Sequence, residues 1–138
     1  MKKKKNPDVD YLAIAAHIGE LMLEKKALDV RILDVSDIAS FTDYFVICSS
    51  ESEPQTKAIA DHIRDELRDN GFRPSHVEGY QHLKWVLMDY YNVIVHIFHV
   101  DTRSYYGIER LWADATITEV KDELDEGTVT ISPATDSE

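Results

Sequence analysis

The chain has 138 residues, 43% of them hydrophobic and 30% charged, which suits one soluble globular domain. It contains no apolar run of about 18 residues, and its first residues, MKKKKNPDVD, lack the apolar segment of a signal peptide, so neither a membrane span nor a secretory leader is expected. The acidic residues number 26 and the basic ones 15, four of which are Lys2 to Lys5, so residues 6–138 carry a net charge of −15. This charge disfavours direct nucleic-acid binding and would attract a basic protein partner, but charge alone favours the simpler interpretation that it keeps the protein soluble.

The first half of the chain predicts one helix and two strands after a basic, disordered lead (residues 1–7). Apolar residues recur at helical spacing over residues 9–26. VRILDV (30–35) predicts a strand, and the continuous apolar run DYFVICS (43–49) predicts a strand buried on both faces. Cys48 in this run is the single cysteine, so it is interpreted as a buried structural thiol in a reducing cytoplasm.

The middle of the chain predicts a second helix and a group of strands. Ser52 and Gln55 form a capping-box signature at the start of this helix, and Asn70–Gly71 ends it. SHVEGY then predicts a short edge strand. WVLMDY and VIVHIFHV predict a hairpin whose tight turn, at Tyr91–Asn92, needs residues that tolerate positive φ.

The last predicted helix is capped by Asp101 or Thr102 and runs to about Ala115. Gly107 lies in its middle, where glycine costs about 1 kcal/mol relative to alanine. Its predicted core stripe consists of Tyr105, Ile108, Leu111 and Trp112. From Glu119 onward the acidic sequence lacks large apolar residues, so residues 119–138 are predicted to be disordered and residues 8–118 to form the domain.

This order of elements predicts an α/β (α+β) fold, a mixed sheet with flanking helices. The hairpin requires an antiparallel pair, so the sheet cannot be wholly parallel.

Metal-dependent nucleotidyl transfer is one chemistry that such a sheet can support, but it needs about three converging carboxylates. Asp43 opens the second strand, yet Phe45 stands at the next position on that face and the neighbouring strand offers His96. Asp43 is therefore interpreted as ordering a loop–strand junction. His96 and His99 point to opposite faces of a strand, so no metal site, cofactor or catalytic residue is predicted.

The stretch from Trp85 to Trp112 concentrates aromatic residues without accompanying catalytic groups. In WVLMDY, alternation places Trp85, Leu87 and Asp89 on one face, which the charge of Asp89 should leave partly exposed. Exposed aromatics beside an acid are typical of a binding surface for a basic partner, and Tyr106 is predicted to join it. An ordinary aromatic core beneath the sheet is the open alternative.

Four segments resemble the ribosome-silencing factor (RsfS, Iojap-like) family over residues 28–115: LDVRILDVSDIASFTDYFVICSS, QTKAIADHI, EGYQHLKWVLMDYYNVIVHIF and RSYYGIERLWADA. The resemblance implies a nucleotidyltransferase-like fold without its catalytic residues. It also implies a translational repressor that binds the fourteenth protein of the large ribosomal subunit. That binding would block joining of the small subunit and lower protein synthesis when nutrients are limiting. The contact candidates are Trp85, Leu87, Asp89, Tyr90, Tyr106, Glu78 and Asp43.

Two alternatives to this function stay open at the level of sequence. One is a nucleotide-binding or residual nucleotidyltransferase domain centred on Asp43. The other is a homodimeric scaffold whose aromatic face is self-complementary.

Overall fold

The computed structural model describes residues 6–123 and 128–133, so the predictions made for residues 1–5, 124–127 and 134–138 lie outside the described part of the chain. Its elements, in chain order, are α1 (Tyr11–Glu24), β1 (Leu28–Asp34), β2 (Tyr44–Ser50), α2 (Glu53–Asp69), β3 (His76–Glu78), β4 (Trp85–Asp89), β5 (Val93–His99), α3 (Val100–Tyr106), α4 (Ile108–Leu111), β6 (Thr116–Glu123) and β7 (Thr128–Pro133).

The strands form one seven-stranded sheet in the order β3-β4-β5-β2-β1-β6-β7. The central pair, β2 and β5, is parallel, and every other described pair is antiparallel. A parallel pair needs a crossover connection, which α2 supplies between β2 and the β3–β4–β5 group. The predicted mixed sheet with flanking helices is therefore confirmed.

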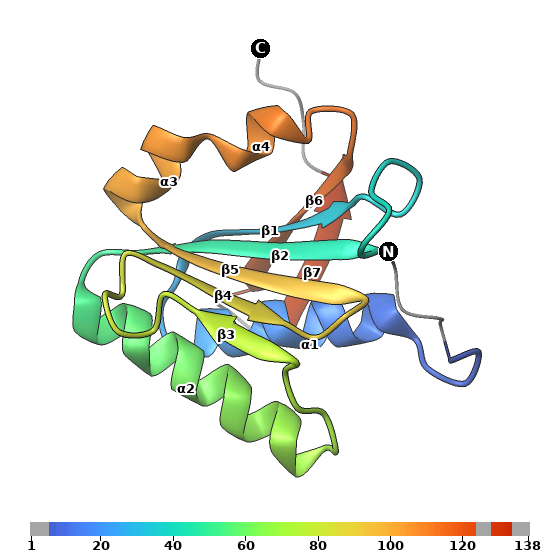
Figure 1. Cartoon of the computed structure of the whole chain (residues 1–138), viewed down its shortest axis with the longest axis horizontal. Coiled ribbons are helices and arrows are strands. Elements are labelled where there is room, and N and C mark those ends of the chain that lie inside the picture. Colours follow the sequence, from blue (N-terminus) through green and yellow to red (C-terminus); the bar gives the residue numbers. More distant parts are fainter. Residues whose placement is uncertain (1–5, 124–127, 134–138) are drawn as a thin grey trace.

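The helices lie on both sides of the sheet. Figure 1 shows α1 and α2 along one face, and α3 and α4 above the other. This arrangement explains why β2 reads as a continuous apolar run, since it is the middle strand and is covered on both faces.

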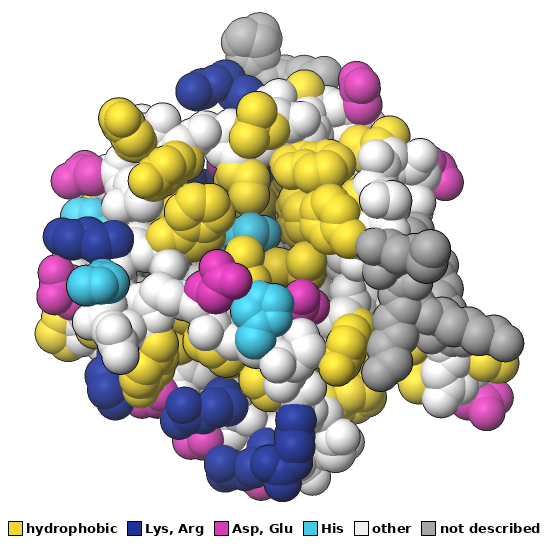
Figure 2. Space-filling model, viewed as in Figure 1, with side chains coloured by type: hydrophobic (Ala, Val, Ile, Leu, Met, Phe, Trp, Pro, Cys, Tyr) yellow, Lys and Arg dark blue, Asp and Glu magenta, His cyan; other side chains and the backbone are white. Residues whose placement is uncertain are grey.

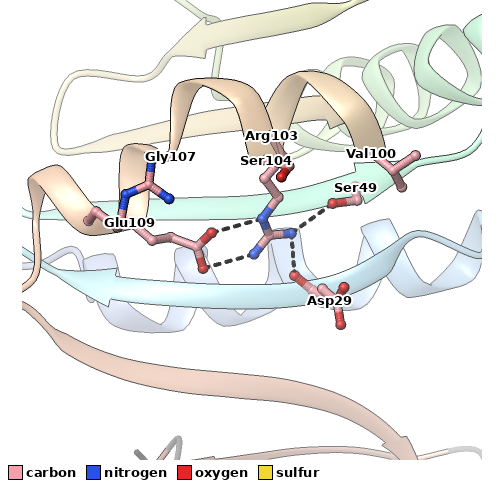
Figure 3. A pocket seen from close by; sticks show the side chains of 8 residues that line it. Asp29, Ser49, Val100, Arg103, Ser104, Gly107 and Glu109 are labelled. Atoms are coloured by element: carbon pink, nitrogen blue, oxygen red, sulfur yellow. Dashed lines mark hydrogen bonds and ion pairs between the residues drawn. The ribbon is translucent and has the colours of Figure 1, made fainter. Parts of the chain in front are cut away.

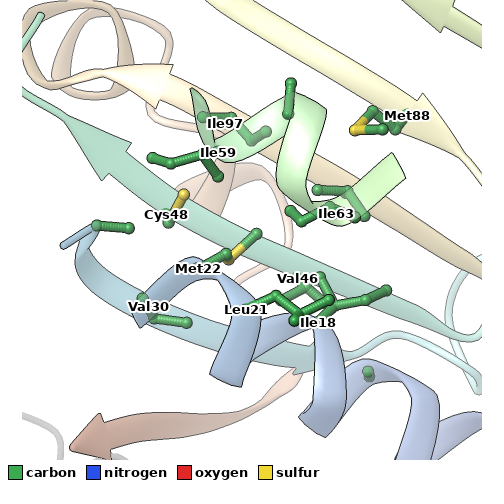
Figure 4. Close-up of a cluster of buried hydrophobic side chains, with 14 of the residues drawn as sticks. Ile18, Leu21, Met22, Val30, Val46, Cys48, Ile59, Ile63, Met88 and Ile97 are labelled. Carbon is green, nitrogen blue, oxygen red and sulfur yellow. The ribbon is translucent and has the colours of Figure 1, made fainter. Parts of the chain in front are cut away.

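The larger core lies between the sheet and the helices α1 and α2 (Figure 4). Ile18 and Met22 of α1 and Ile59 and Ile63 of α2 are fully buried there against the sheet. Cys48 is also fully buried in this core, and burial raises the pKa of its thiol to about 12, which confirms the interpretation as a structural cysteine.

Side chains cap the starts of the first two helices. Asp10 caps α1 by accepting a hydrogen bond from the backbone N–H of Ala13. Ser52 caps α2 by accepting from the backbone N–H of Gln55, as the capping-box signature predicts. No helix in the described ranges is both long and apolar enough to span a bilayer.

The predicted single helix from residue 101 to about 115 is wrong in two respects. His99 rather than Asp101 or Thr102 caps α3, because its Nδ1 accepts from the backbone N–H of Asp101. Gly107 then ends α3 in the left-handed conformation, with φ 56° and ψ 43°, and α4 starts after it. Glycine is favoured at such a position because it carries no Cβ.

The predicted disordered tail is also wrong for the part that the structure describes. β6 crosses residue 118, the predicted end of the domain, and pairs with both β1 and β7. Val120 is buried and packs on Gly19 of α1, where an added Cβ would come within 3.1 Å of Val120 Cγ2. The prediction of disorder rested on the small number of apolar residues in this segment. The segment nevertheless forms a strand, because pairing with β1 supplies hydrogen bonds to its backbone.

Candidate protein-binding surface

Strand β4 presents Trp85, Leu87 and Asp89 on the sheet face opposite α1 and α2. All three side chains are half-buried, whereas Val86 and Met88 between them are buried against those helices. This alternation confirms the face that the sequence predicted for the three residues. It leaves a tryptophan and a leucine partly open to solvent at the end of the sheet that α4 does not cover.

Trp85 is held in a fixed orientation by its neighbours. Its indole N–H donates a hydrogen bond to Nδ1 of His96 at 3.1 Å. Its ring stacks on Phe98 of β5, with centroids 4.8 Å apart, and contacts Tyr106 of α3 at 5.0 Å. A tryptophan constrained in this way loses little side-chain entropy when a partner binds it.

The ring contacts continue across the face from α3 to the loop before β2. We call the connected side chains the aromatic patch: Phe41, Phe45, Trp85, Leu87, His96, Phe98, Tyr105, Tyr106 and Trp112. Tyr105 is 80% exposed and Tyr106 52% exposed, while Phe45 and Phe98 are buried beneath. Figure 2 shows hydrophobic side chains gathered in the upper part of the view, around a histidine.

Acidic side chains border the patch on the side of the edge strand β3. The register pairs Glu78 with Leu87 and His76 with Asp89, which places all four side chains on the face that carries the patch. His76 Nε2 lies 3.1 Å from the carboxylate of Glu78, which is itself well exposed. Figure 2 shows acidic and histidine side chains directly below the hydrophobic group. The margin therefore offers carboxylates to a basic partner.

A hollow of about 590 Å³ adjoins the patch, between the loop that precedes β4 and helix α3. Its lining comprises Gly79, His82, Lys84, Trp85, Asp101, Thr102, Tyr105 and Tyr106. The loop is fastened to α2 because the hydroxyl of Tyr80 donates to Asp61 at 2.6 Å. Gly79 allows the close approach of this loop to β4, since a Cβ there would overlap the carbonyl oxygen of Trp85.

Helix α3 is anchored on the sheet by Arg103, a buried residue (Figure 3). Its guanidinium donates two hydrogen bonds to Glu109, and its Nη1 donates to the backbone carbonyl of Asp29 and to Ser49 Oγ. Arg31 of β1 also donates to Glu109, at 3.0 Å. This network fixes α3 and α4 over β1 and β2, and so fixes the position of Tyr106 beside Trp85.

Two of the predicted contact residues do not lie at the surface. Tyr90 is 8% exposed and packs in the core beneath α1 and α2, because it continues the alternation of Val86 and Met88. Asp43 is fully buried and its carboxylate accepts a hydrogen bond from the Asn92 side chain at 2.9 Å. Asp43 therefore joins β2 to the β4–β5 turn, and both residues are corrected from contact to structural positions.

The five other candidates, Trp85, Leu87, Asp89, Glu78 and Tyr106, lie together on this face; that they bind a partner stays a prediction.

The sequence-based prediction missed Tyr105 and Leu111, which it placed in a core stripe, although Tyr105 is 80% and Leu111 77% exposed. The break at Gly107 changes the helical phase on which that stripe depended. The sequence-based prediction also missed His96, because its contact with Trp85 follows only from the β4–β5 register.

The geometry around Asp43 also bears on the nucleotidyltransferase alternative. Across the residues that the structure describes, no group of three or more His, Cys, Asp or Glu side chains is arranged to hold a metal ion. The Asp43 carboxylate is engaged with Asn92. His96 is neutral at ordinary pH, because burial lowers its pKa to about 3. These observations give metal-dependent transfer no support.

Comparisons with known proteins agree on one family. Residues 9–138 match the family described as "Ribosomal silencing factor during starvation". The ribosomal silencing factor RsfS of Bacillus subtilis is 42% identical over 97 residues, covering 70% of this chain and 82% of that protein. Chloroplastic Iojap of Zea mays is 30% identical over 113 residues, covering 82% of this chain and 49% of that protein. A crystal structure from Chromobacterium violaceum, 30% identical, covers 76% of this chain and 88% of its own with a TM-score of 0.74.

Proposed function

The chain belongs to the family of ribosomal silencing factors, and on that premise we propose that it represses translation by binding the large ribosomal subunit through the aromatic patch. The partner that the family resemblance implies is the fourteenth protein of that subunit. A protein seated there, on the face that meets the small subunit, would prevent the two subunits from joining. Such obstruction needs neither nucleotide nor metal.

The observation that carries this proposal is the partly exposed Trp85, fixed between Phe98 and Tyr106 and bordered by carboxylates. Rigid tryptophan and tyrosine side chains are the residues that most often dominate protein interfaces. The surrounding charge, −15 over residues 6–138, suits a ribosomal protein that is basic because it binds RNA. The acids would steer such a partner toward the patch while the rings provide the affinity.

Co-sedimentation with purified bacterial large subunits tests the proposal. Trp85→Ala is expected to weaken binding by at least about 2 kcal/mol, or roughly 30-fold, the scale of a hot-spot truncation. Tyr106→Ala should weaken it as well, because Tyr106 is exposed and contacts Trp85. Leu12→Ala is the matched control, since Leu12 is 48% exposed on α1, on the opposite side of the sheet.

Two outcomes would count against the proposal. Undiminished binding by the Trp85 and Tyr106 variants would remove the patch from the interface. Equal losses in the Leu12 variant would show that the substitutions act through general stability. Raising the salt concentration should also slow association, because ions screen the attraction between acidic margin and basic partner.

A further inference from the structure

His96 occupies the centre of the aromatic patch and has two ring nitrogens with different surroundings. It lies on β5 directly opposite Leu87 of β4. Its Nδ1 accepts the hydrogen bond from the Trp85 indole, which can only donate. In the neutral ring the single hydrogen must therefore be on Nε2, which becomes a donor.

The Nε2 donor has no hydrogen-bond partner among the described residues. His96 is 3% exposed and Nε2 is one of three buried side-chain polar atoms left unpaired there. Around the ring lie Phe45, with centroids 4.9 Å apart, and Phe98 at 6.0 Å, neither of which accepts a conventional hydrogen bond. A buried donor without a partner is costly, so such an atom in a native protein calls for an explanation.

The unpaired nitrogen points toward the side from which a partner would come. Side chains of a strand stand roughly perpendicular to the sheet, and His96 shares the face of Trp85 and Leu87, opposite α1 and α2. Nε2 is one of the two ring atoms farthest from the backbone, so it lies toward the outer side of the sheet, buried beneath the patch. The half-buried side chains of Leu87 and Trp85 are its neighbours on β4.

We propose that a backbone carbonyl oxygen of the protein partner accepts a hydrogen bond from Nε2 of His96 when that partner docks on the aromatic patch. A neutral acceptor is expected, because Glu78 and Asp89 share this face and would repel a carboxylate. A displacement of the Leu87 side chain on docking would open the way to the ring. The inference rests on the proposed function and names one polar contact within an otherwise apolar interface.

A substitution that keeps an acceptor in the place of Nδ1 but removes Nε2 tests the inference. In His96→Asn, the amide oxygen stands at the same number of bonds from the backbone as Nδ1, so it can still accept from Trp85. Nothing replaces Nε2. The variant is expected to keep the Trp85 indole N–H resonance of the wild type and to bind large subunits roughly 10- to 100-fold more weakly. Tyr90→Phe is the control, because it alters a buried hydroxyl on the other side of the sheet and should bind as the wild type does.

The wild-type protein supplies a second readout that does not depend on the folding of a variant. With ¹⁵N-labelled histidine, the Nε2–H resonance of His96 should shift downfield on addition of the purified fourteenth large-subunit protein. Full-strength binding by a folded His96→Asn, or an unchanged Nε2–H resonance in the complex, would overturn the inference while leaving the proposed function intact. Failure of the wild type to bind large subunits would instead overturn the proposed function.

Discussion

The indole N–H of Trp85 and Nδ1 of His96 form a hydrogen bond across the β4–β5 pair, at 3.1 Å, on the face that carries the aromatic patch. This bond fixes the rotation of a partly exposed tryptophan that stacking on Phe98 alone would not determine. The orientation of Trp85 is therefore set before any partner arrives, which lowers the entropy lost on binding.

A double-mutant cycle measures this bond. Trp85→Phe and His96→Phe each leave one partner without the other, so each should lower the free energy of unfolding. The double variant should be less destabilised than the sum of the two by roughly 0.5–1.5 kcal/mol, the net value of one hydrogen bond. Urea denaturation provides the four free energies. Strict additivity would show that the two side chains do not interact energetically.

The pair Arg103–Glu109 is expected to make stability depend on pH. Burial acts to raise the pKa of Glu109, but hydrogen bonds and charges from Arg103 and Arg31 outweigh it and hold the pKa below the usual 4.5. A carboxyl with a lowered pKa stabilises the fold above about 4.5, and that contribution is lost as pH falls through the folded-state value.

Glu109→Gln should therefore lower the free energy of unfolding at pH 7 by roughly 1–3 kcal/mol, as expected for hydrogen bonds to a charged group. The difference from wild type should shrink as the pH is lowered below 4.5. Urea titrations at several pH values, with the wild type alongside, provide the comparison. If the difference in unfolding free energy does not change with pH, it does not arise from the charge of Glu109.

Tyr90→Phe should leave the fold equally stable or stabilise it. The Tyr90 hydroxyl is buried without a hydrogen-bond partner in the described structure, and burial raises its pKa to about 12. Deleting an unsatisfied hydroxyl removes a desolvation cost of about 1 kcal/mol or more. Thermal and urea unfolding test this expectation. A clear loss of stability would indicate that the hydroxyl is hydrogen-bonded in solution.

Tyr91 lies in the turn between β4 and β5 with φ 73°, in the left-handed region. Because this conformation costs most residues about 1–2 kcal/mol and asparagine less, Tyr91→Asn should raise the free energy of unfolding by about 0.5–1 kcal/mol. Tyr91→Ala is the matched control, since it also removes the ring but keeps the unfavourable conformation. Equal stability changes in the two variants would show that the effect comes from loss of the Tyr91 ring and not from the backbone conformation.

Local patterns predicted much of this structure because their signals act over a few residues. Alternation in β4 identified the face of Trp85, Leu87 and Asp89, and Ser52 with Gln55 located the start of α2. The contact between Trp85 and His96 depends on strand register, and the burial of Asp43 depends on Asn92, 49 positions away. Such long-range pairings leave no signal in either segment alone.

The prediction from helical periodicity failed for part of the last helix because the helix is interrupted at Gly107. Continuous helical spacing placed Tyr105 and Leu111 in the core, but the left-handed break restarts the helix and turns both side chains outward. Tyr106, which the same spacing left outside the predicted core stripe, lies exposed beside Trp85, so the periodic pattern was right for this residue.

The rate and extent of ribosomal subunit association, followed by light scattering, test the central claim most directly. Large subunits incubated with saturating protein should fail to join small subunits, and the same large subunits incubated with Trp85→Ala at equal concentration should join them to a greater extent. Normal association in the presence of saturating wild-type protein would contradict the account.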